Sequence, residues 1–114
     1  LERRKRFILS GADGAGGIQI DAGAARALLS GSSLLPVGVT SVSGEFERGD
    51  TVSVRDSNGR ELARGLASYQ ADELAKITGR QSQEIESILG YAYGEEVIHR
   101  DQLVLLTRQQ EEAS

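Results

Sequence analysis

Apolar and polar residues alternate along short stretches of the chain, and turn-forming residues separate these stretches. The alternation is clear at residues 37–44, 51–55 and 60–68, and β-branched residues are frequent in the first two. A period of two with β-branched side chains is typical of strands that bury one face. Further strand-like segments occur at residues 5–10, 17–21, 96–100 and 102–106, the last two separated only by Asp101. The pattern therefore predicts about six short strands.

Three other segments have the spacing of short helices. Residues 22–30 follow Asp21, whose carboxylate is suited to accept hydrogen bonds from the first amides of a helix. The second helix is predicted at residues 71–77, and the third at residues 82–89 with Ser82 as its N-cap. Short strands with a few helices, and no regular strand–helix alternation, favour an α+β fold built on a barrel-like mixed sheet.

Two turn signals connect these elements. The sequence "DSNG" at residues 56–59 predicts a hairpin, and its Asn-Gly pair favours a type I′ turn because both residues tolerate positive φ angles. The chain's only proline, Pro36, restricts Leu35 to extended geometry. The first helix should therefore be followed by extended chain.

Length and composition exclude several classes of protein. A chain of 114 residues is long enough for one domain with its own core. Without cysteine, and with a single histidine, it can form neither a disulfide framework nor a zinc site of cysteine or clustered histidine ligands. The longest aliphatic run near the end, "LVLL", is far shorter than the roughly 20 residues that span a bilayer. A cytoplasmic protein without metal or membrane contact is expected.

Charge is distributed unevenly along the chain. The net charge is −4, but residues 1–40 carry five basic and three acidic groups (+2), whereas residues 41–114 carry eight and fourteen (−6). Nucleic-acid binding usually depends on a basic surface that neutralises phosphates. RNA binding is therefore weakly supported. The chain does not begin with methionine, which favours its being a piece of a longer protein.

No combination of residues assembles an active site. The "HRD" at residues 99–101 superficially matches the protein-kinase catalytic loop, but Leu106 stands where that loop needs asparagine. The glycine-rich segment 11–17 is not followed by the lysine of a P-loop. Neighbouring carboxylates such as Glu95 and Glu96 diverge on regular elements. Neither catalytic residues nor metal ligands are therefore expected.

The stretch from Leu34 to Tyr69 resembles the PUA domain, a small pseudo-barrel found in RNA-modifying enzymes. The residues that carry this resemblance are Pro-x-Gly-Val at 36–39, Phe-x-x-Gly-Asp at 46–50, and Gly65 in a strand that leads to a short helix. The resemblance implies an α+β fold with a PUA-like mixed β pseudo-barrel of about six short strands and about three short helices.

Residues 82–105, "SQEIESILGYAYGEEVIHRDQLVL", resemble the C-terminal end of bacterial glutamate 5-kinases, in which a PUA domain follows an amino-acid-kinase domain. This resemblance implies a homo-oligomeric parent enzyme that uses ATP and Mg²⁺ to phosphorylate the side-chain carboxylate of L-glutamate, the first step of proline biosynthesis. It implies a linker from the kinase domain at 1–4, the PUA domain at 5–107 and a polar tail at 108–114. The 114 residues themselves would hold no cofactor.

The resemblance also suggests a contact surface. RNA-binding PUA domains use the helix that begins near Asp21 and the proline–glycine loop, so the corresponding residues here form a candidate surface for RNA or for a neighbouring domain. They are Arg26, Leu34, Leu35, Pro36, Val37 and Gly38. Because the loop carries leucine and valine in place of lysine, the favoured role is regulation or contact with the kinase domain. The alternative is an RNA-binding module of an RNA-modifying enzyme.

Overall fold

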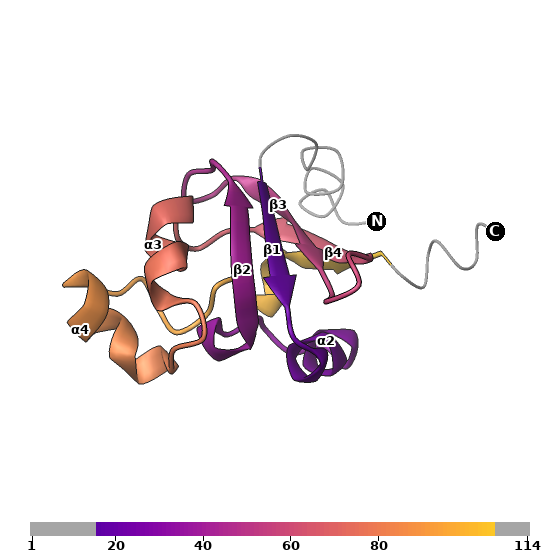
Figure 1. Ribbon diagram of the computed structural model, residues 1–114, viewed down its shortest axis with the longest axis horizontal. Coiled ribbons are helices and arrows are strands. Elements are labelled where there is room, and N and C mark those ends of the chain that lie inside the picture. The colour runs from indigo at the N-terminus through magenta and orange to yellow at the C-terminus, as the bar shows by residue number, and fades with distance from the viewer. Residues whose placement is uncertain (1–15, 107–114) are drawn as a thin grey trace.

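The computed structural model describes residues 16–106, which form one mixed five-stranded sheet with short helices around it (Figure 1). The predicted strand at 5–10, the linker at 1–4 and the tail at 108–114 lie outside the described residues. The strands are β1 (Gly16–Ile20), β2 (Val39–Gly44), β3 (Thr51–Arg55), β4 (Glu61–Leu66) and β5 (Leu103–Leu105). The α-helices are α2 (Ala22–Leu29), α3 (Ala71–Ile77) and α4 (Ile85–Leu89), and short 3-10 turns are η1 (Pro36–Gly38), η2 (Ser82–Glu84) and η3 (Arg100–Gln102).

The strands lie in the order β2-β1-β3-β4-β5. β1 and β3 are parallel, and every other neighbouring pair is antiparallel. Because β1 and β2 are antiparallel partners, the chain between them, with α2 and η1, returns at one end of the sheet. Helices α3 and α4 lie together beside β2, well away from α2 (Figure 1). The α+β prediction is confirmed.

The core lies against both faces of the central strand β3. Val52 and Val54 are fully buried, as the alternating pattern predicts, but the polar residues that alternate with them, Thr51 and Ser53, are buried as well. Ser53 is accommodated because its hydroxyl donates a 2.7 Å hydrogen bond to Glu61 Oε2. Burial of Glu61 opposes its ionisation, but the hydrogen bonds from Arg64 and Ser53, together with the positive charges of Arg64 and Arg55, hold its pKa below the usual value.

Three local predictions need correction. The strand expected at 37–44 begins only at Val39, because Pro36–Gly38 forms a 3-10 turn. Of the strand expected at 96–100, only Ile98 pairs, in an isolated bridge with Leu34. The third helix begins with a 3-10 turn capped by Gln81 rather than Ser82, since Gln81 and Glu84 form a reciprocal capping box.

The hairpin between β3 and β4 is confirmed, but its turn is not of type I′. Among the described residues only glycines have positive φ, so Gly59 (φ +83°) does and Asn58 does not. The Gly59 amide donates to the Asp56 carbonyl at 3.0 Å, and the Asp56 carboxylate accepts from the amides of Asn58 and Arg60. A turn followed by a left-handed glycine shifts the strand register, here between Val54 and Arg55.

Candidate interaction surface

The first half of the site is the junction between α2 and the proline–glycine turn. Asp21 is the N-cap of α2, as predicted, and its Oδ1 accepts a 2.7 Å hydrogen bond from the Ala24 amide. The Asp21 amide in turn donates to the Gly38 carbonyl at 3.0 Å. On the other side of the turn, the Gly79 amide donates to the Pro36 carbonyl at 2.9 Å. The turn is therefore held between α2 and the end of α3.

A hollow of about 390 Å³ opens beside this junction. Its apolar wall includes the side chains of Leu35 and Val37, which are 41% and 44% exposed. The other lining residues are Asp21, Gly23, Ala24, Ala27, Ser32, Ser33, Leu34 and Gly38. The hollow is thus open to a partner and mostly apolar.

The residues predicted to form the surface divide into two groups. Leu34, Leu35, Val37 and Gly38 line the hollow, although Leu34 and Gly38 are themselves buried. Pro36 is buried, and Arg26 is exposed on α2; neither lines the hollow. The only charged group in the lining is the Asp21 carboxylate, so this part of the surface favours an apolar partner over a phosphate backbone.

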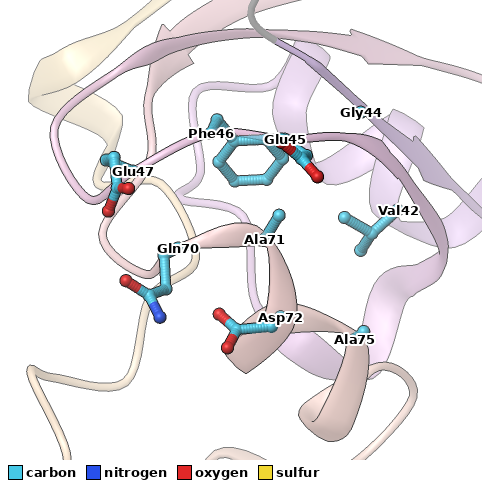
Figure 2. A pocket seen from close by; sticks show the side chains of 9 residues that line it. All are labelled: Val42, Gly44, Glu45, Phe46, Glu47, Gln70, Ala71, Asp72 and Ala75. Atoms are coloured by element: carbon cyan, nitrogen blue, oxygen red, sulfur yellow. The ribbon is translucent and has the colours of Figure 1, made fainter.

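A second hollow of about 450 Å³ lies between α3 and the loop that follows β2. Figure 2 shows Phe46 over the hollow, with the side chains of the first turn of α3 on the opposite side. Its apolar side chains are Val42, Phe46, Ala71 and Ala75, and its polar ones are Glu45, Glu47, Gln70 and Asp72. The three charged side chains are all carboxylates.

Next to this hollow lies a cluster of the chain's three tyrosines. Tyr69 is fully buried, and its hydroxyl donates to the Gly94 carbonyl at 2.7 Å and accepts from the Tyr93 amide at 2.8 Å. The Tyr93 ring lies 5.3 Å from each of the other two rings, and the Arg48 guanidinium lies 3.8 Å from its centroid. The buried polar groups are satisfied, so the cluster fixes the loop after α4.

Glu73 joins the cluster to α3. This buried carboxylate accepts from the Gln70 amide at 3.0 Å and from the Tyr91 hydroxyl. The hydrogen bond to Glu73 is the main reason that the pKa of Tyr91 is raised to about 12. Loss of the Tyr91 proton would place a second negative charge beside the carboxylate.

Replacement of Glu73 by glutamine is expected to return the pKa of Tyr91 toward its ordinary value of 10.0. In the native protein the contribution of Tyr91 to stability is present below about pH 10 and is lost as the pH rises through about 12. NMR titration of the Tyr91 ring measures the shift, and Glu86→Gln is the control. An unchanged Tyr91 titration in Glu73→Gln would show that the carboxylate is not the cause.

Within residues 16–106, no group of His, Cys, Asp and Glu side chains is arranged to hold a metal ion. No helix in the same range is both long and apolar enough to cross a membrane.

Comparison with known proteins identifies the class. Residues 16–89 match the PUA domain family, so the chain belongs to that family. A solved structure agrees: the PUA domain of Aeropyrum pernix, crystallised as a tartrate complex, gives a TM-score of 0.55 at 28% identity, over 74% of this chain and 41% of that one. A chain of an H/ACA ribonucleoprotein bound to a substrate RNA gives 0.55 at 19% identity, over 75% and 22%, a likeness of fold alone.

Within this family the chain is homologous to the C-terminal part of glutamate 5-kinase. It is 55% identical over 107 residues to the glutamate 5-kinase of Vibrio vulnificus, a match that covers 93% of this chain. The match covers 28% of that relative, so the chain spans little more than a quarter of its length.

The tyrosine cluster and the acidic hollow are absent from the sequence-based predictions. Tyr91 and Tyr93 lie more than twenty residues after Tyr69, so the sequence does not indicate that the rings are in contact. Likewise, Glu45 and Asp72 share a hollow only because Phe46 packs beside α3, where its carbonyl accepts from the Ala71 amide at 3.0 Å. The only indication of the acidic hollow in the sequence is that Phe46 lies between Glu45 and Glu47.

Proposed function

We propose that this chain is the non-catalytic PUA domain of a glutamate 5-kinase and that it serves as a regulatory and docking module for the amino-acid-kinase domain. The parent enzyme would transfer the γ-phosphate of ATP, with Mg²⁺, to the side-chain carboxylate of L-glutamate. The 55% identity to a glutamate 5-kinase supports the proposed parent enzyme. A cytoplasmic location and a homo-oligomeric parent belong to this proposal.

The observation that carries the docking role is the apolar hollow beside α2. Leu35 and Val37 keep more than two fifths of their surface exposed, although the turn that carries them is tied to both α2 and the end of α3. A rigid, partly exposed apolar wall around one carboxylate fits a protein surface better than a nucleic acid. The kinase domain of the same polypeptide is the partner present at the highest effective concentration.

Leu35→Asp is expected to weaken this docking without unfolding the domain. Because Leu35 is 41% exposed, the isolated 114-residue chain should lose no more than about 0.5 kcal/mol of stability. In the full-length enzyme the same substitution should lower the temperature at which the two domains separate and should alter kinetic regulation. Calorimetry of both forms checks this, with Leu29→Asp as the control, since Leu29 is 49% exposed and does not line the hollow. Equal effects of both variants would contradict docking at this hollow.

The parent activity has its own test. The longer protein that carries this domain should form γ-glutamyl phosphate from ATP and L-glutamate in the presence of Mg²⁺, detectable as the hydroxamate after trapping with hydroxylamine. The 114-residue chain alone should form none. Product from the chain alone, or none from the longer protein, would contradict the proposed parent.

RNA binding is the second candidate, favoured by the fold that this chain shares with a chain of an RNA-bound ribonucleoprotein and by exposed Arg26 on α2. A filter-binding titration of the chain against tRNA at two salt concentrations distinguishes the candidates. Salt-sensitive binding that Arg26→Gln weakens would support an RNA-binding module. Its absence leaves the docking role as the function of this surface.

A further inference from the structure

The hollow between α3 and the loop after β2 has the features of a peptide-binding groove. Phe46 is held firmly, since only 6% of it is exposed, and it lies beside the apolar side chains of Val42 and Ala71. Around these, the carboxylates of Glu45, Glu47 and Asp72 belong to exposed residues. An apolar floor with a negative rim fits a segment that carries positive charges next to an apolar side chain.

The neighbouring tyrosine cluster extends the same preference. Tyr91 and Tyr93 are 42% and 43% exposed, and Glu73 at their edge belongs to the same helix as Asp72. The Tyr93 ring already binds a guanidinium, that of Arg48, over its face. Arg48 therefore occupies the face of Tyr93, and Tyr91 remains as an exposed aromatic ring near the rim. The three rim carboxylates favour a cationic partner and disfavour nucleic acid.

The chain carries such a segment near its N-terminus. Residues 3–7 read Arg-Arg-Lys-Arg-Phe, four consecutive cations followed by an aromatic residue. They lie outside the described residues, but β1 begins at Gly16, immediately beside the hollow: a Cβ placed on Gly16 would lie 2.5 Å from the Phe46 ring. Eight residues lie between Phe7 and Gly16, so the two positions can be up to about 30 Å apart. A tether of this length gives an effective concentration near the millimolar range.

We propose that the hollow lined by Phe46, Glu45, Glu47 and Asp72 is the binding site of the basic segment 3–7 of the same chain. The aromatic ring of Phe7 enters the apolar floor, and the basic side chains pair with the carboxylates of the rim. The contact fixes the path by which the chain enters β1. This surface is separate from the hollow beside α2 and does not depend on the proposed function.

The absence of tryptophan from the chain provides a direct test. In a Phe7→Trp variant of the 114-residue chain, the single tryptophan should have blue-shifted emission and be shielded from acrylamide. Adding Glu45→Gln and Glu47→Gln should raise the acrylamide quenching constant about twofold or more, and added salt should act in the same direction, because exposed ion pairs are weak and screened. The matched control is Glu86→Gln with Glu95→Gln, which removes the same charge from exposed residues outside the hollow.

Three results would overturn the proposal. The first is a tryptophan that is as accessible to acrylamide in the Phe7→Trp chain as it is in a free peptide of residues 1–10. The second is an equal effect of the rim pair and the control pair, which would show that shielding depends on net charge alone. The third is shielding that increases with protein concentration, which would show that the hollow binds the basic segment of a second copy of the chain. Circular dichroism of every variant verifies that the fold is intact.

Discussion

Gly65→Ala is expected to lower the free energy of unfolding by about 2–3 kcal/mol, because the buried strand β4 has no room for another carbon atom. A Cβ at this position would lie 2.7 Å from Ile98 Cγ2 and 2.9 Å from the carbonyl oxygen of Gln102. Ile98 could shift only at the expense of its bridge to Leu34, and the Gln102 carbonyl belongs to the backbone that enters β5. Chemical denaturation with urea measures the loss.

Gly23→Ala is the matched control for this prediction. Gly23 lies in α2, and a Cβ there would be 3.5 Å from its nearest neighbour, the Asp21 Oδ1 atom, which is an ordinary contact. Alanine is the better helix former, so this variant should be unchanged or more stable by up to about 1 kcal/mol. Equal stability of the two variants would contradict the close packing of β4 against Ile98.

Gly38→Ala is expected to have the second largest effect, a loss of about 1–3 kcal/mol of unfolding free energy together with a change in the hollow beside α2. The added Cβ would lie 2.5 Å from the Ala24 Cβ, so α2 must move away from the proline–glycine turn. Such movement would strain the hydrogen bond between the Asp21 amide and the Gly38 carbonyl. The same variant should weaken docking of the kinase domain in the full-length enzyme.

A double substitution makes this prediction specific. In the Gly38→Ala, Ala24→Gly chain the new Cβ would face the Cα of residue 24 at 3.6 Å, an ordinary contact. Ala24→Gly alone should cost about 1 kcal/mol as a helix substitution. The double variant should be no less stable than Ala24→Gly alone, which gives a coupling energy of about 1 kcal/mol or more in urea denaturation. Simple additivity of the two losses would contradict a direct contact between these residues.

Local chemistry accounts for the parts of the fold that the sequence predicts correctly. Asp21 caps α2 because a carboxylate there can reach the Ala24 amide whatever the surroundings. Alternating apolar residues place Val52 and Val54 in the core for the same reason, since strand geometry alone puts them on one face. In both cases the interactions that decide the structure are made by residues close in the chain.

Two of the failures involve partners on separate strands or segments of the chain. Ser53 is buried because Glu61 on the neighbouring strand accepts a hydrogen bond from its hydroxyl. Ile98 forms a bridge rather than a strand because, within residues 16–106, it pairs with Leu34 alone. Neither partner follows from propensity or periodicity. The turn at Asn58 fails for a local reason instead: the Asp56 side chain and carbonyl bind the amides of the turn, which the Asn-Gly pair alone does not indicate.

The amino-acid sequence by itself determined that this protein is an α+β domain with a capped first helix and an apolar proline–glycine turn, and its motifs identified the PUA family. Only the tertiary structure decided which side chains share a surface. It brings the loop at Glu45–Glu47 beside Asp72 on α3, and it brings Tyr69 to Tyr93. The physical reason is that local hydrogen bonds and backbone preferences act within a few residues. The grouping of distant side chains depends instead on packing of the whole core.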